Sequence, residues 1–232
     1  MYSFIWKGQN SLDDYGLWIR KLPVRVRPSE RHKVVKVPGK PGSMILTEGD
    51  DVFDSYAAEM VVTCPNTIPI DRVMAWLRGS SELVLSNDID KCRPARIVGQ
   101  VRFDRDGNSI LVGTIPFLFQ PFRQSRFPEQ TDRKTITGTS ATITNLGDVA
   151  SRPKVTITGS GNNTITIGGM AMTFTGISGT IVVDCDAEMI TSNGALWTGT
   201  STGDFWRIPT GQSTITQTGS MTIVVDPCWR WL

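Results

Sequence analysis

The stretch KVTITGSGNNTITI, residues 154–167, indicates the fold class of this 232-residue chain. Thr alternates with Val or Ile on both sides of a centre rich in Gly, Ser and Asn. In an extended strand, this alternation places one face in a core and the other in water. We therefore predict two short strands, 154–158 and 164–167. They should be joined by a tight turn at 159–163, because Gly and Asn tolerate the positive φ that hairpins need.

The same pattern recurs throughout the second half of the chain. Segments of alternating β-branched residues, bounded by Gly, Asn or Pro, also occupy 135–137, 141–144, 172–175, 180–183, 213–216 and 221–225. A second tight turn is expected at Gly168-Gly169. About eight short strands separated by turn signals predict an antiparallel β-sandwich or jelly roll.

The first half combines strand patterns with one helix. Pro69 lies near the start of the helical pattern and Gly79 just past its end, as is typical of a short helix. Its apolar stripe, which should face a sheet, consists of Ile70, Val73, Met74 and Leu77. Strands are expected at 2–7, 17–20, 33–37, 43–47, 58–63, 82–85, 96–103 and 110–119. The chain as a whole is predicted to be mainly β.

Composition changes near Lys134. Of the 24 Lys and Arg residues, 20 lie in residues 1–134, and the later part is rich in Thr, Ser, Gly and Ile. We predict an N-terminal β-rich domain over 1–134, with a polar linker at 126–134, and a C-terminal sandwich over 135–232. A hydrophobic content of 39% and a charged content of 20% are those of a folded chain.

The sequence has no apolar run long enough to span a bilayer, and its start lacks the pattern of a signal peptide. We expect no membrane insertion. The four cysteines, at 64, 92, 185 and 228, are far apart and form no C-x-x-C pair. They are therefore expected to be free, buried thiols rather than zinc ligands or a disulfide framework, and no cofactor is expected.

Residues suited to catalysis are few. His32 is the sole histidine and lies in a charged run, which favours a solvated side chain over a catalytic base. The segment Asp104-Arg105-Asp106-Gly107-Asn108 favours a hairpin turn over a calcium loop. Asp184, Asp186 and Glu188 would share one face of a strand and suit a cation, but a salt-bridged surface is the favoured interpretation. We predict no catalytic, metal or cofactor site and no enzymatic activity.

Arginines and aromatic residues are interleaved at 20–27 and 119–127. A net charge of +2 over the whole chain favours protein interfaces over nucleic-acid binding for these two segments. Four tryptophans are candidates for stacking on sugars, or for filling a core or an interface, and we favour the second role. They are Trp197, Trp206, Trp229 and Trp231.

Several short motifs follow one another along nearly the whole chain. They are Phe4-x-Trp6-x-Gly8, Ser11 with 14–17, 29–31, 37–42, 61–64, 76–79, 82–86, 117–122, 143–147, 152–157, 183–186 and 204–211. In this order they resemble the distal tail proteins of siphophages. The loop at 37–42 is similar to the Pro-Gly-Arg-x-Gly hairpin of that family, with Lys40 in place of the arginine.

The resemblance implies a structural protein of the bacteriophage virion, made in the cytoplasm of the bacterial host and placed at the tail tip or baseplate. The N-terminal domain would form a homo-oligomeric, hexameric ring, with a galectin-like sandwich at its periphery. The ring would join the tail tube protein to the tail-tip hub protein and to receptor-binding proteins during host adsorption. Its pore would pass DNA without sequence-specific binding. The runner-up function is a carbohydrate-binding module protein that contacts host surface glycans.

A physical argument accompanies the resemblance. Two mainly-β domains in one short chain leave sheet edges, which a ring can pair or cover. We predict that a hairpin at 37–43 reaches a neighbouring protomer. Its candidate contact residues are Val37, Pro38, Gly39, Lys40, Pro41 and Gly42.

Overall fold

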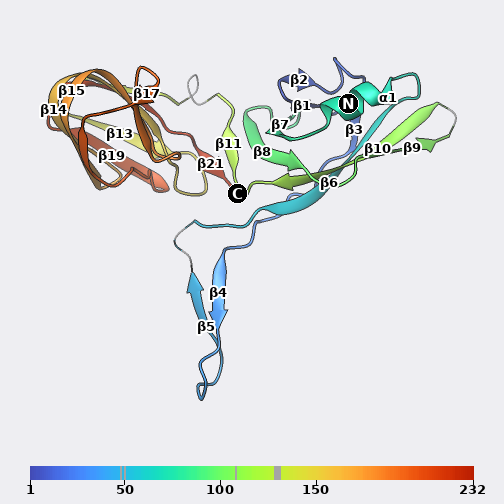
Figure 1. Ribbon diagram of the computed structural model, residues 1–232, viewed down its shortest axis with the longest axis horizontal. Helices are drawn as coiled ribbons and strands as arrows, with labels where there is room; N and C mark the ends of the chain where they lie inside the picture. The colour runs from blue at the N-terminus through green and yellow to red at the C-terminus, as the bar shows by residue number, and fades with distance from the viewer. Residues whose placement is uncertain (48, 50, 108, 128–131) are drawn as a thin grey trace. The chain divides into compact units, whose positions relative to one another are not determined.

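The computed structural model describes all residues except 48, 50, 108 and 128–131, and it divides into two compact units (Figure 1). The N-terminal unit is Met1–Arg126 together with Leu232, and the C-terminal unit is Phe127–Trp231. This division lies at the start of the linker predicted at 126–134, whose residues 128–131 are outside the described part. Both units consist mainly of antiparallel strands, which confirms the mainly-β prediction.

The N-terminal unit contains a large antiparallel sheet and one helix. Its elements are β1 (Phe4–Trp6), β2 (Gln9–Asn10), β3 (Trp18–Lys21), β4 (His32–Val35), β5 (Met44–Thr47), β6 (Tyr56–Pro65), α1 (Ile70–Trp76), β7 (Ser80–Leu85), β8 (Lys91–Ile97), β9 (Arg102–Asp106), β10 (Ile110–Phe119) and β11 (Arg123–Ser125). The sheet has the order β2-β1-β7-β8-β10-β6-β3, with β9 on β10 and β11 on β8. β4 and β5 form a separate hairpin.

The longest ladder of this unit joins β6 to β10, from Ile110 opposite Pro65 to Phe119 opposite Tyr56. Alternate β10 residues are buried, as the strand pattern predicted. The other edge of β10 pairs first with β9 and then with β8. The prediction of one strand over 96–103 is therefore wrong. Gly99 breaks it with a φ of +82°, directly after Val98, whose N–H donates to the carbonyl of Pro116, a residue with no N–H to donate in return.

Helix α1 packs on the sheet through an aromatic cluster. Its predicted position is confirmed, and Val73 and Leu77 of the apolar stripe are buried. Trp76, which the stripe did not include, stacks on Tyr15 with ring centroids 4.1 Å apart and donates from Nε1 to the Trp6 carbonyl. No helix in the described residues is long and apolar enough to cross a membrane.

Ser11 explains the spacing of the first sequence motif. Its buried hydroxyl accepts a hydrogen bond from Phe4 N at 3.0 Å and donates to the Leu17 carbonyl at 3.0 Å. One side chain therefore ties the start of β1 to the residue that precedes β3. Lys7 and Gly8, with φ of +51° and +75°, form the two-residue turn between β1 and β2.

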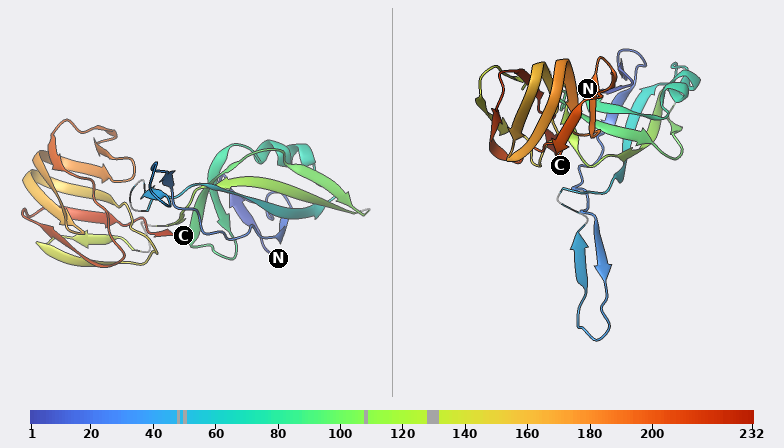
Figure 2. Two further views of the ribbon diagram at one scale, coloured as in Figure 1. Left: turned by 90° about the horizontal axis from the view of Figure 1, so that it is seen from below. Right: turned by 60° about the vertical axis from the view of Figure 1, so that its left-hand side comes forward.

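The C-terminal unit is a curved antiparallel sheet that wraps around one core (Figure 2). The strands of this sheet are β12 (Lys134–Ile136), β13 (Ser140–Asn145), β14 (Lys154–Ile167), β15 (Met170–Asp184), β16 (Met189–Ser192), β17 (Ala195–Leu196), β18 (Thr200–Gly203), β19 (Gly211–Gln217) and β20 (Thr222–Asp226). The short strand β21 (Arg230–Trp231) belongs to the same unit but not to this sheet. One half of the β14–β15 hairpin pairs with β20 and β16, and the other half with β19 and β18. The two halves thus join different sets of strands around the same core, as a sandwich requires.

The turn predicted at 159–163 is wrong, because β14 continues through this segment and pairs with β15 throughout. The register shifts where two steps along β14, from Gly161 to Asn163, face three along β15, from Ile177 to Phe174. The extra β15 residue creates a bulge at Gly176, whose φ is +76°. By contrast, the tight turn predicted at Gly168-Gly169 is confirmed, with φ of +59° and +84°.

The bulge lies beside a buried polar network. Asn163, 2% exposed, donates from Nδ2 to Oε1 of Gln217 at 2.8 Å. The Gln217 amide nitrogen donates to the carbonyls of Gly138 and Met221, each at 2.8 Å, and its Oε1 also accepts from Met221 N. Gln217 thus satisfies backbone groups of two turns that the strands themselves leave unpaired.

We predict that Gln217→Leu lowers the free energy of unfolding by about 3 kcal/mol or more, because three buried polar groups and the part-buried Gly138 carbonyl lose their partner. Gln212→Leu, an exposed glutamine on the same strand, should change it by no more than about 0.5 kcal/mol. Urea denaturation of both variants measures the difference. Equal denaturation midpoints for Gln217→Leu and Gln212→Leu would show that the buried network adds no stability.

Candidate functional site

The β4–β5 hairpin, together with the chain that leads into and out of it, forms an arm over residues 22–55. Its two strands pair only with each other among the described residues, from His32 opposite Thr47 to Val35 opposite Met44. In Figures 1 and 2 the hairpin stands clear of the N-terminal sheet in every view. Every described residue from Lys36 to Thr47 is exposed. The arm is thus a large accessible feature of its unit.

Apolar side chains lie on both faces of the hairpin. On one face Val34 pairs with Ile45, and these are 53% and 65% exposed. On the other face Val35 pairs with Met44, and Leu46 lies opposite Lys33. Residues 31–47 also hold four Lys or Arg and no Asp or Glu. The hairpin therefore combines apolar side chains with a strong positive charge.

The base of the arm is anchored by backbone pairing and aromatic packing. Arg31 N donates to the Val52 carbonyl at 2.8 Å, and Asp54 N to the Ser29 carbonyl at 2.9 Å. Phe53 is buried and meets Phe122 edge to face, with centroids 5.6 Å apart. These contacts bring the two ends of the arm together at the sheet.

The structure places the predicted contact residues 37–42 at the tip of the arm. Gly39 and Gly42 have φ of +78° and +85°, where side chains with a Cβ are strained. Lys40 N donates to the Val37 carbonyl at 3.2 Å, and Val37 is 40% exposed. These residues form one accessible turn, and their role at a subunit contact stays a prediction.

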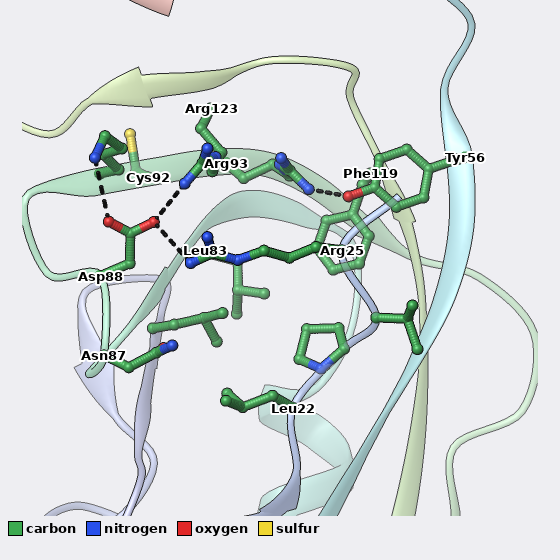
Figure 3. A pocket seen from close by; sticks show the side chains of 14 residues that line it. Leu22, Arg25, Tyr56, Leu83, Asn87, Asp88, Cys92, Arg93, Phe119 and Arg123 are labelled. Atoms are coloured by element: carbon green, nitrogen blue, oxygen red, sulfur yellow. Dashed lines mark hydrogen bonds and ion pairs between the residues drawn. The ribbon is translucent and has the colours of Figure 1, made fainter. Parts of the chain in front are cut away.

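A pocket of about 290 Å³ lies within the N-terminal unit, between the outgoing arm segment and the sheet (Figure 3). Its apolar lining comes from Leu22, Leu83, Leu85, Tyr56 and Phe119. The two basic and aromatic segments noted in the sequence, 20–27 and 119–127, both contribute lining residues. The two segments could thus be identified in the sequence as basic and aromatic, but their proximity to each other and to β8 follows only from the fold.

Charge in this pocket is unevenly distributed. Asp88 contacts Arg123 at 2.8 Å, Lys91 at 3.4 Å and Arg25 at 3.6 Å. Arg93 donates to the Tyr56 hydroxyl, and its guanidinium lies over the rings of Tyr56 and Phe119 at 5.4 and 5.7 Å. Burial, together with the charges of Arg123 and Arg25, lowers the pKa of Arg93 to about 10. The low pKa reflects first the burial of the Arg93 guanidinium and then the positive charges next to it.

The four candidate tryptophans do not form a common surface. Trp206 and Trp229 are 0% and 1% exposed in the C-terminal core, so stacking on a sugar does not fit their positions. Trp197 and Trp231 are partly buried against that core. Trp197 packs near Phe174, with centroids 5.9 Å apart, and lines a shallow hollow. Trp231 donates from Nε1 to the Leu146 carbonyl.

The acidic residues at 184–188 do not alternate on one strand. Asp184 ends β15, whereas Glu188 lies in the following turn with a φ of +52°. Each carboxylate has its own cation, because Asp184 pairs with Lys154, Asp186 with Arg230 and Glu188 with Arg152. Burial alone would raise the pKa of Asp184, but hydrogen bonds from Ala187 N and Lys154 bring it below its ordinary value. The arrangement is a salt-bridged surface.

The remaining candidates also have ordinary surroundings. His32 is exposed, with Nδ1 3.0 Å from the Glu30 carbonyl oxygen. The hairpin turn predicted at 104–108 is confirmed by the pairing of Asp106 with Ile110, although Asn108 is outside the described residues. All four cysteines are free thiols; three are buried and Cys228 is partly buried. Within the described residues no group of His, Cys, Asp or Glu is arranged to hold a metal ion.

Comparisons with known proteins find a similarity among the solved structures. No family model matches the chain, and no curated protein matches it. Among solved structures, the chain shares its fold with a component of a phage adsorption apparatus. This is the crystal structure of the Dit protein (gp 19.1) of SPP1, described as a paradigm of the hub adsorption apparatus in phages that infect Gram-positive bacteria. The similarity has a TM-score of 0.75 at 15% identity and covers 100% of both chains. The resemblance to distal tail proteins is therefore confirmed at the level of the fold.

The buried thiols predict a specific dependence of stability on pH. Burial raises the pKa of Cys185 to about 12 from 9.0, so its stabilising contribution is complete below pH 9 and falls as pH rises toward 12. Between pH 8 and pH 10 the loss for this one thiol is about 1.4 kcal/mol. The free energy of unfolding of the wild type, measured with denaturant, should therefore exceed that of Cys185→Ala by about 1.4 kcal/mol less at pH 10 than at pH 8. A difference in free energy of unfolding between wild type and Cys185→Ala that is the same at pH 8 and pH 10 would contradict the raised pKa of Cys185.

Proposed function

We propose that this chain is a structural hub of a long flexible phage tail. It would assemble into a hexameric ring between the tail tube protein and the tail-tip hub protein, and would carry receptor-binding proteins. Its place would be the tail tip of the virion, and DNA would pass through the ring without sequence-specific binding. Its work would be done by contacts between subunits rather than by catalysis.

The observation that carries this proposal is the fold shared with SPP1 Dit over the full length of both chains. A match that covers all of both chains extends over both units, rather than over one common β module. One fold can serve many functions, so the surface of the protein must also suit the proposed role. The arm is the part of the surface that suits contacts between subunits.

The arm is built for contact with another molecule. An isolated two-stranded hairpin is at best marginally stable in water, and this one exposes apolar side chains on both faces. A neighbouring subunit that covers either face would bury those side chains and order the hairpin. Repetition of this head-to-tail contact around a rotation axis closes a ring. The tip residues 37–42 would lie at the far end of the contact.

Ile45 on the arm tests the ring directly. We predict that Ile45→Ser raises the concentration needed for assembly by roughly tenfold or more, because burial of one Ile contributes about 2 kcal/mol per contact. Size-exclusion chromatography with light scattering over a dilution series measures the assembled mass. The wild type should run at the mass of a ring.

The matched control is Leu196→Ser, which removes an apolar side chain of similar exposure, 68% against 65%, from the C-terminal unit. It should assemble like the wild type. Replacing Pro38 and Gly39 by alanine tests the tip separately, and unchanged assembly of that variant would exclude the tip from the contact. A wild-type chain that stays monomeric at all concentrations, alone and with tail tube protein, would refute the ring.

A second candidate function is glycan binding by the C-terminal unit. It is favoured by the hollow beside Trp197, which the polar chain at 198–200 and the exposed Leu196 also line. A partly exposed aromatic face next to hydroxyl groups suits a sugar ring. If the full chain binds on a glycan array and Trp197→Ala abolishes that binding, glycan binding is favoured as a function. If the full chain binds no glycan, the structural hub is the one proposed function that remains.

A further inference from the structure

The pocket beneath the arm holds more positive than negative charge. Its charged lining residues, all in the described part of the chain, are Arg25, Lys91, Arg93 and Arg123 against Asp88. One carboxylate therefore faces three guanidinium groups and one ammonium group. Arg93 is partly buried and the Arg123 side chain is 19% exposed, and holding like charges partly out of water without enough counter-charge is costly. The site accordingly favours an additional anion.

Two of the four cations, Arg93 and Arg123, are held in place before any ligand arrives. Arg93 is fixed between its hydrogen bond to Tyr56 and the rings of Tyr56 and Phe119. Arg123 is fixed by Asp88 at 2.8 Å and by the Leu232 carbonyl at 3.0 Å. Arg25 differs, because its side chain is 68% exposed and its Asp88 contact is 3.6 Å. It can therefore turn toward a ligand while the others stay in position.

We propose that this pocket binds an extended acidic peptide segment of another tail protein. A carboxylate of the segment would lie against Arg25 and Arg123, and a neighbouring apolar side chain would enter the space lined by Leu22, Leu83 and Leu85. Guanidinium groups hold carboxylates through paired, directed hydrogen bonds, which gives such a contact its orientation.

Two features of the site favour this ligand over the alternatives. A free inorganic anion would satisfy the charges but would leave the apolar lining of a 290 Å³ pocket exposed. The arm of a second copy is the wrong occupant, because residues 31–47 hold four basic and no acidic residues. The ligand must bring both negative charge and an apolar side chain.

This proposal is separate from the ring. The pocket lies on the sheet and on the segment that leads out to the hairpin, whereas the ring contact uses the hairpin itself. A ring that forms with the pocket empty would support the first proposal and say nothing against the second. Peptide binding by a monomer would support the peptide-binding proposal and would say nothing against the ring.

The test uses the full chain and a fluorescent, end-blocked hexapeptide of alternating leucine and glutamate, with binding followed by fluorescence anisotropy. We expect saturable binding that weakens as salt rises. The same peptide with glutamine in place of glutamate should bind at least about tenfold more weakly. Arg25→Gln should weaken binding of the glutamate peptide by a similar factor, and Leu22→Trp, which fills the apolar part, should abolish it.

Arg27→Gln is the matched control, since Arg27 lies on the same segment, is 73% exposed and pairs with Glu30 outside the pocket. It should bind like the wild type, and circular dichroism should show each variant folded. Equal binding of the glutamine peptide, or equal loss in Arg25→Gln and Arg27→Gln, would overturn the proposal. So would displacement of the peptide by an equal concentration of inorganic phosphate, or tighter binding of a thymidine oligonucleotide.

Discussion

The ten-residue ladder between β6 and β10 holds the N-terminal unit together. Its start, at Pro65 and Ile110, leads to helix α1 and the β9–β10 turn, and its end, at Tyr56 and Phe119, forms the aromatic side of the pocket. The arm leaves and rejoins the sheet next to that end, where Phe53 packs on Phe122. Helix, pocket and arm are thus all positioned by one backbone pairing whose register cannot slip without turning its buried face to water.

Regular periodicity made much of this fold predictable. The strand at 110–119 and the helix at 70–77 follow from alternation and from an apolar stripe, because nothing in the tertiary structure competes with them. The segment 159–163 was mistaken for a turn because a bulged strand and a hairpin use the same residues. Trp76 was missed because its partners, Phe4 and Tyr15, are distant in sequence. The pocket could not be predicted either, since four separate segments form it, although two of its arginines, Arg25 and Arg123, were visible in basic runs.

The arm and the pocket share an electrostatic property. Both are basic and both offer apolar side chains, so both are complementary to acidic, partly apolar surfaces. The C-terminal unit differs, because its carboxylates at 184–188 are each neutralised by a cation of the same unit. On this account, contact with other proteins is concentrated in the N-terminal unit.

The closed base of the arm has a consequence for how this chain can vary. Because Arg31 pairs with Val52 and Asp54 with Ser29, the chain returns to the sheet where it left, whatever lies between. Insertions or deletions in the hairpin therefore cost little beyond a slowly growing loop entropy. Its length and composition can therefore change while both sheets keep their pairing, so a different binding partner can be accommodated by exchanging one short segment of sequence.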